Sequence, residues 1–127
     1  MLWVLPYALP SFALRDSLAP AYANADVMSD ALFTRYWDMM LAPGVRQAVI
    51  DRMSQTVLVD PVPLLKAVEA PTLLMWGEKD GMIPFANSAD YLRALPHATL
   101  AALPGIGHIP QEEAPMTVAI LRKFLDR

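Results

Sequence analysis

Two short apolar runs in the second half of the chain constrain its fold most strongly. The first covers residues 72–76 and ends at Gly77, and the second covers residues 98–103 and ends at Pro104-Gly105. A continuous apolar run of this length is typical of a strand covered on both faces, as in parallel sheets. Because a helix-forming segment separates the runs, they predict a strand–helix–strand unit with a right-handed crossover, and hence an α/β fold.

Helices are expected between the two strands and after them. Pro84 opens the crossover helix, and the last helix is expected to begin near Pro115. The apolar positions of that last helix recur at helical spacing and predict its packed side, which is Val118, Leu121 and Leu125. Glu112 and Glu113 would serve the first turn of this helix, where the helix dipole favours acidic side chains.

The first part of the chain, residues 1–69, has the pattern of successive helices. Ser29 is predicted to cap a helix whose apolar residues recur at helical spacing until Pro43-Gly44 ends it. Asp60 is predicted to cap a short third helix with Pro61 at its first position. We therefore divide the chain into an all-helical segment, residues 1–69, and a strand–helix–strand–helix segment, residues 70–127.

Composition excludes several classes of function. The chain has 127 residues, with 10 basic and 13 acidic side chains, and this charge balance argues against a nucleic-acid binder. It has no cysteine, which excludes a disulfide scaffold, a thiol nucleophile and a cysteine zinc site. The two histidines and the scattered carboxylates lack the spacing of a metal site, so we expect no metal and no cofactor.

No targeting or membrane segment is predicted. Residues 1–14 carry no basic side chain and contain two prolines, which does not fit a secretory signal. The longest uncharged run, residues 94–111, contains three prolines and two glycines and is not expected to span a membrane. We expect a cytoplasmic protein.

The loops that follow the two apolar runs carry the side chains that could take part in catalysis. Asp80 lies in the first loop and His108 in the second. Because the carboxyl ends of parallel strands meet at one edge of a sheet, these two side chains are expected to lie close together. A carboxylate beside an imidazole accepts the Nδ1 proton and stabilises the imidazolium that forms when Nε2 takes a proton. The competing interpretation is that Asp80 only closes a turn and His108 only bonds to backbone.

Both loops and their strands resemble the α/β-hydrolase superfamily. Residues 70–80, Ala-Pro-Thr-Leu-Leu-Met-Trp-Gly-Glu-Lys-Asp, followed by Ile83-Pro84, are similar to its acid-bearing segment. Residues 104–108, Pro-Gly-Ile-Gly-His, followed by two glutamates and a proline, are similar to its histidine loop. The resemblance implies that Asp80 is the acid of a catalytic triad and His108 its general base. It also implies that residues 1–69 are a helical lid, and that the whole chain is the C-terminal portion of such a fold.

The nucleophile of that family is missing from the chain. No serine follows a glycine by two positions, as Gly-x-Ser-x-Gly requires; the serines are Ser11, Ser17, Ser29, Ser54 and Ser88. The earlier strands and the oxyanion hole are missing as well. We therefore expect a C-terminal fragment of a Ser-Asp-His hydrolase that is inactive alone.

The resemblance leaves the substrate and the partners open. A small apolar or ester-type substrate would contact Ile83 and Ile109, which neighbour the two catalytic positions, and Trp37 of the lid. Helical spacing equally fits Trp37 as a core residue. The alternative functions are a non-catalytic interaction module and one half of a split enzyme that needs an N-terminal partner. Self-association through an open strand edge is a further expectation.

Overall fold

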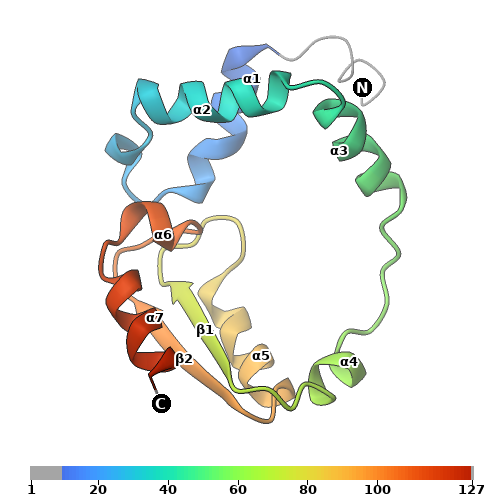
Figure 1. Cartoon of the computed structure of the whole chain (residues 1–127), viewed down its shortest axis with the longest axis vertical. Helices are drawn as coiled ribbons and strands as arrows, with labels where there is room; N and C mark the ends of the chain where they lie inside the picture. The colour runs from blue at the N-terminus through green and yellow to red at the C-terminus, as the bar shows by residue number, and fades with distance from the viewer. Residues whose placement is uncertain (1–9, 127) are drawn as a thin grey trace. The chain divides into compact units, whose positions relative to one another are not determined.

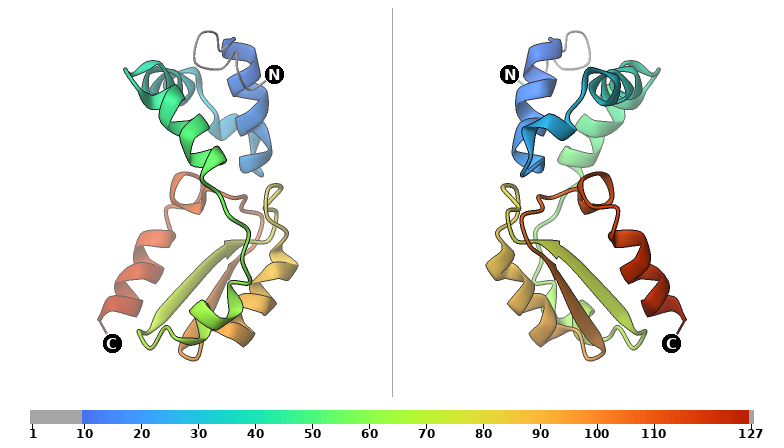
Figure 2. Two further views of the ribbon diagram at one scale, coloured as in Figure 1. Left: turned by 90° about the vertical axis from the view of Figure 1, so that its right-hand side faces the viewer. Right: turned by 90° about the vertical axis from the view of Figure 1, so that its left-hand side faces the viewer.

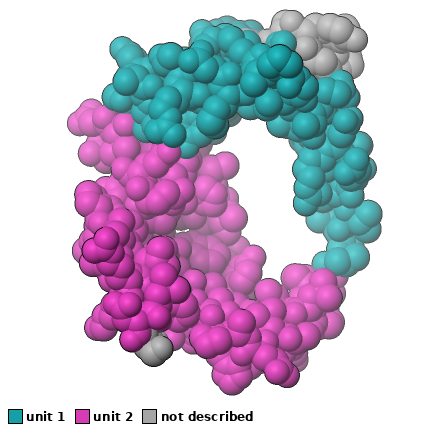
Figure 3. Space-filling model, viewed as in Figure 1, with its two compact units in different colours: residues 1–19, 28–59 teal, residues 20–27, 60–127 magenta. Residues whose placement is uncertain are grey.

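The computed structural model describes residues 10–126 as two compact units. Unit 1 contains the described part of Met1–Ala19 together with Met28–Val59. Unit 2 contains Pro20–Val27 and the chain from Asp60 onward (Figure 3). The expected division at residue 69 differs from these units, because residues 20–27 and 60–69 lie with the strands of unit 2.

Unit 1 is helical, with helices α1 (Ser11–Leu18), α2 (Asp30–Leu41) and α3 (Val45–Ser54). The predicted cap of α2 is confirmed, since the Ser29 hydroxyl accepts a hydrogen bond from the amide of Leu32 over 3.2 Å. This bond satisfies one of the amides that a helix start leaves unpaired.

Contacts of one arginine join α1 to α2. The guanidinium of Arg15 lies 4.2 Å from the centre of the Phe33 ring and forms a 2.9 Å ion pair with Asp30. Further along α2, the ring of Trp37 stacks on Phe33 at a centroid distance of 6.3 Å. Phe33 of α2 therefore contacts both α1 and the next turn of its own helix.

Unit 2 is built around two parallel strands. Strand β1 (Thr72–Gly77) pairs with β2 (Ala98–Leu103) in a register that runs from Thr72 opposite Ala98 to Gly77 opposite Leu103. The expected α/β fold with two parallel strands is confirmed. The helical elements of this unit are η3 (Ala25–Val27), α4 (Val62–Lys66), η4 (Phe85–Asn87), α5 (Ser88–Ala94), α6 (Pro110–Glu113) and α7 (Thr117–Leu125), while the short η2 (Ala19–Ala21) joins the two units in sequence.

Helices α5 and α7 cover opposite faces of the sheet (Figures 1 and 2). The ring of Trp76 on β1 contacts Tyr91 of α5, with centroids 5.5 Å apart. The β1 side chains remain half-buried except at Gly77, which is buried. Leu103, at the end of β2, is the largest fully buried side chain of the described residues. Both strands therefore end in buried residues at the carboxyl end of the sheet.

Two helix starts differ from the expected positions. Helix α4 begins at Val62, one residue later than predicted, and the Asp60 carboxylate accepts a hydrogen bond from the Val62 amide over 3.0 Å. The last helix begins at Thr117 and is preceded by the separate short helix α6, which the sequence pattern did not predict. Glu112 and Glu113 belong to α6, so their expected placement in the first turn of the last helix is wrong.

The predicted packed side of α7 is also wrong. Val118, Leu121 and Leu125 are 43–68% exposed. Thr117 is buried instead, and its hydroxyl donates to the carbonyl of Ala114 over 2.8 Å. Ile120, three positions later, is half-buried, so the inner side of the helix follows Thr117 and Ile120.

None of the helices within residues 10–126 is both long enough and apolar enough to cross a membrane.

Gly77 allows the end of β1 to approach the loop that follows β2. A Cβ atom at position 77 would lie 2.1 Å from the carbonyl oxygen of Gly107 and 2.2 Å from that of Ile106. The same approach is held by a 2.9 Å hydrogen bond from the Lys79 amide to the Ile106 carbonyl. Because glycine has no side chain, Gly77 lets the end of β1 lie against the loop that follows β2.

We predict that Gly77→Ala destabilises unit 2 strongly. Neither backbone carbonyl can move away cheaply, so the cost should exceed the roughly 1–2 kcal/mol of a residue forced into a left-handed conformation. Urea unfolding followed by tryptophan fluorescence measures it. Gly105→Ala is the control, because Gly105 has a φ of +73° but no atom within 4 Å of an added Cβ. Equal destabilisation by the two substitutions would contradict the prediction.

Candidate active site

Asp80 and His108 meet at the carboxyl end of the two strands. Asp80 follows β1 by three residues, and His108 lies in the loop after β2. The Nδ1 atom of His108 lies 2.8 Å from Oδ2 of Asp80, at hydrogen-bond distance. The expected contact between the two side chains is therefore present in the structure.

The carboxylate of Asp80 is held at both of its oxygens. Oδ1 accepts hydrogen bonds from the amides of Met82 and Ile83, each over 2.8 Å, while Oδ2 faces His108. The side chain is only 5% exposed. Burial acts to raise the pKa of Asp80, but the hydrogen bonds from Ile83, His108 and Met82 and the charge of His108 outweigh it, so the pKa lies below its ordinary value. Asp80 is thus a fixed carboxylate anion at neutral pH.

The backbone of His108 is held by a hydrogen bond to Ala21, and its ring is oriented by Asp80. Its amide donates a 2.7 Å hydrogen bond to the carbonyl of Ala21, from the segment Pro20–Val27 of the same unit. When Nδ1 donates its proton to Asp80, Nε2 carries the lone pair and can accept a proton. The side chain is 35% exposed, so this second nitrogen is available for chemistry.

Sequence reasoning missed the role of the two glutamates of α6. The Tyr22 hydroxyl donates a short hydrogen bond to Glu112. The Glu113 carboxylate accepts hydrogen bonds from the amides of Ala23, Asn24 and Gly107. The sequence pattern predicts for the two glutamates only a place in the first turn of the last helix. Partners about 90 positions earlier in the chain leave no signal in local spacing.

A pocket of about 360 Å³ adjoins the Asp80–His108 pair. Ile83 lines it, so this predicted substrate contact lies beside the pair. Its full lining is Leu73, Leu74, Met75, Trp76, Gly77, Asp80, Ile83, Tyr91 and His108. Ile109 is not among these residues; its carbonyl accepts hydrogen bonds from the amides of Glu112 and Glu113.

Trp37 belongs to unit 1, where its ring stacks on Phe33. The substrate-binding roles expected for Trp37, Ile83 and Ile109 stay predictions, as do the catalytic roles of Asp80 and His108.

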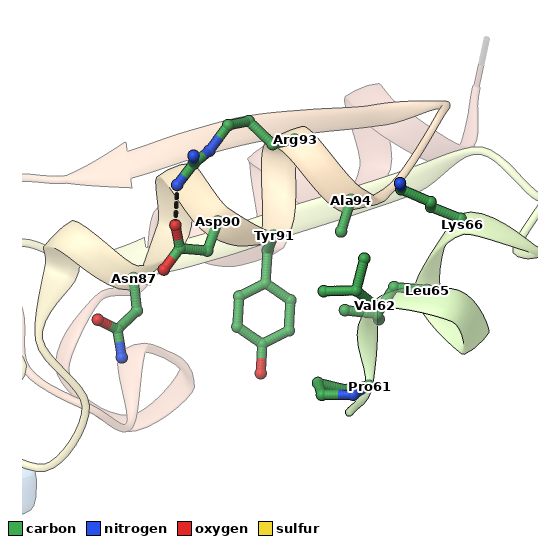
Figure 4. A pocket seen from close by; sticks show the side chains of 9 residues that line it. All are labelled: Pro61, Val62, Leu65, Lys66, Asn87, Asp90, Tyr91, Arg93 and Ala94. Atoms are coloured by element: carbon green, nitrogen blue, oxygen red, sulfur yellow. Dashed lines mark hydrogen bonds and ion pairs between the residues drawn. The ribbon is translucent and has the colours of Figure 1, made fainter. Parts of the chain in front are cut away.

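A second pocket, of about 530 Å³, lies between α4 and the η4–α5 segment (Figure 4). Asp90 and Arg93 form an ion pair at its rim, and neither Asp80 nor His108 lines it. Tyr91 lines both pockets. Within residues 10–126, no three acidic or histidine side chains are grouped so that they could hold a metal ion.

Solved structures resemble the chain over nearly its whole length. A serine hydrolase involved in carbazole degradation matches with a TM-score of 0.79 and 20% identity, over 97% of this chain and 50% of that protein. The meta-cleavage product hydrolase of Pseudomonas fluorescens matches with a TM-score of 0.78 and 17% identity, over 97% and 48%. These similarities show that the chain has the fold of α/β-hydrolases and spans about half the length of the solved proteins.

Sequence comparison adds a shorter similarity. Epoxide hydrolase 1 of Caenorhabditis elegans is 33% identical over 61 residues, which are 47% of this chain and 15% of that protein. No family model matches the chain. By its name, this relative is also a hydrolase. The similarity covers only 15% of its length.

We predict that Asp80 stabilises unit 2 in a pH-dependent way. Because its folded pKa lies below its ordinary value of about 4, its contribution is fully present above that value and is lost as the pH falls through the folded pKa. Asp80→Asn should lower the free energy of unfolding at pH 6 by about 1–3 kcal/mol, and this difference should shrink toward pH 3. Urea unfolding at both pH values measures it.

Asp126→Asn is the matched control, because Asp126 is exposed and belongs to the same unit. A stability difference between the original chain and Asp80→Asn that stays constant from pH 6 to pH 3 would count against the prediction.

Proposed function

We propose that this chain, which has an α/β-hydrolase fold, supplies the acid and the general base of a hydrolytic active site. Asp80 is the acid and His108 the base. The 2.8 Å contact between Nδ1 of His108 and a carboxylate that is 5% exposed carries the proposal. A residue that only closed a turn would need the amides of Met82 and Ile83 but no imidazole.

The proposed mechanism uses Nε2 of His108 to transfer one proton in each of two half-reactions. Nε2 accepts the proton of a nucleophilic hydroxyl as the oxygen attacks the substrate carbonyl, and Asp80 stabilises the imidazolium. Nε2 then gives the proton to the leaving group. In the second half-reaction Nε2 takes a proton from the water that attacks the acyl group, and returns this proton to the oxygen of the nucleophile as the acid leaves. No Gly-x-Ser-x-Gly sequence is present in the 127 residues, so the nucleophile would come from outside them.

The pocket beside the pair favours a small apolar or ester-type substrate. Its walls include Leu73, Met75, Trp76 and Ile83, while Asp80, His108 and Tyr91 are its titratable residues. Apolar walls with a few placed polar groups are typical of small-molecule sites. We propose that Ile83 contacts the substrate, because it lies on this wall next to the acid.

We predict that the isolated chain is nearly inactive. A base without its nucleophile lacks the group that forms the covalent intermediate. Hydrolysis of p-nitrophenyl acetate by the 127-residue chain should not exceed that of free imidazole at the same concentration. Turnover that is lost in both Asp80→Asn and His108→Ala would contradict the need for an outside nucleophile.

We predict that the pair functions when a nucleophile is provided. The N-terminal half of the carbazole-degradation serine hydrolase, joined to this chain, should hydrolyse the same ester. His108→Ala should lower its kcat by about 10²–10⁴, the usual contribution of a general base. His97→Ala is the control, since His97 is exposed and precedes β2. Turnover of the joined protein that His108→Ala leaves unchanged would refute the proposed role.

One observation favours a partner-dependent function, either a split enzyme or an interaction module. The amides of Thr72 and Glu78 donate to the β2 side, to His97 and Leu103. Because alternate residues of a strand bond to opposite edges, the amides of Leu73 and Met75 point to the other edge. No strand pairs with that edge within the described residues. An unpaired parallel edge of this kind accepts a further strand.

We predict that this edge is where the chain associates. At low concentration the amides of Leu73 and Met75 should exchange with solvent much faster than those of Leu74 and Trp76. Addition of a partner strand, or self-association at high concentration, should slow the first pair alone. Hydrogen exchange combined with sedimentation measures both. A monodisperse monomer with all four amides equally protected would exclude an open edge.

A further inference from the structure

The Glu113 carboxylate joins the histidine loop to a segment far away in the sequence. Its Oε1 atom accepts hydrogen bonds from the amides of Ala23 and Asn24, over 2.8 and 3.0 Å. Its Oε2 atom accepts a short hydrogen bond from the amide of Gly107, which directly precedes His108. One carboxylate thus satisfies three backbone amides from two segments.

The two segments also contact each other without Glu113. The amide of His108 donates to the carbonyl of Ala21 over 2.7 Å. A Cβ atom at position 107 would lie 2.6 Å from that carbonyl oxygen, 2.7 Å from the Ala23 amide nitrogen and 2.7 Å from Oε2 of Glu113. Gly107 therefore lies where the histidine loop, the segment 21–24 and α6 come together.

The same segment reaches the loop of the acid. A Cβ atom at Gly81, next to Asp80, would lie 2.7 Å from the carbonyl oxygen of Pro20. Tyr22, buried within this segment, donates through its hydroxyl to Glu112, the neighbour of Glu113. The segment Pro20–Asn24 thus contacts the loops of both Asp80 and His108 and is tied to α6 by two adjacent carboxylates.

From these contacts we propose that Glu113 is a positioning residue for His108. By holding the Gly107 amide against the segment Ala21–Asn24, it fixes the backbone from which the imidazole projects, and so keeps Nδ1 at Asp80. A hydrogen bond to a charged acceptor is stronger than a neutral one. This inference rests on the proposed function, because a fixed imidazole matters only if Nε2 performs proton transfer. Glu113 itself touches neither reacting group.

The chain contains two histidines, which allows a direct test by NMR with ¹⁵N-labelled histidine. The Nδ1 proton of His108 should give a slowly exchanging downfield resonance that is absent in Asp80→Asn. Glu113→Gln places an NH₂ donor against backbone amide donors, so it should speed the exchange of this proton and of the Gly107 amide by about tenfold or more. The His97 resonances should stay unchanged in every variant.

Glu69→Gln is the matched control, since Glu69 is exposed and lies in the same unit. The proposal fails if Glu113→Gln leaves both exchange rates at the original values. It also fails if Glu113→Gln removes the protection of the Leu74 and Trp76 amides, because Glu113 would then support the whole unit and not the orientation of His108.

Two further outcomes distinguish a failure of this inference from a failure of the proposed function. If the original chain shows no protected Nδ1 proton, or if Asp80→Asn leaves that proton unchanged, the Asp80–His108 pair is refuted, and the positioning role falls with it. If Asp80→Asn removes the resonance and Glu113→Gln changes nothing, only the role of Glu113 is refuted. In the joined hydrolase, Glu113→Gln should lower kcat with little change in KM.

Discussion

The register of two parallel strands is the constraint from which the candidate site follows. Because Gly77 lies opposite Leu103, both strands end at the same level, and the two loops begin side by side. Hydrogen bonds from Glu78 to Leu103 and from Lys79 to Ile106 extend the pairing beyond the strands. Asp80 and His108 then meet at 2.8 Å, although 28 residues separate them. A shift in register would separate the side chains even if both loops kept their conformations.

A segment outside the two strands also supports the Asp80–His108 pair. The segment Pro20–Val27 packs with unit 2 and supplies the Ala21 carbonyl that accepts the His108 amide. Short-range order in the loops therefore depends on contacts made across about 90 positions of sequence. This arrangement explains why a buried carboxylate and a partly exposed imidazole can keep one geometry in loops that have little regular structure of their own.

Much of the fold was predictable from local pattern. The two strands lie where the apolar runs are, because a continuous apolar run bounded by glycine and proline has few other stable conformations. The cap at Ser29 followed from residue type alone. The side of α7 that packs was predicted wrongly, since its apolar residues extend around more than one face. Hydropathy alone does not choose between such faces; the packing of α7 on β1 does.

By itself, the sequence determined the strands, the two loops and the residue types that they carry. The spacing of apolar residues and the position of turn-forming residues are local properties of the chain. Only the tertiary structure decided that the Asp80 carboxylate is buried with both oxygens bonded, and that Glu113 bridges the histidine loop to residues 23 and 24. Those facts depend on which backbone amides meet a carboxylate in space. That meeting is set by the packing of distant segments, and no spacing along the chain encodes it.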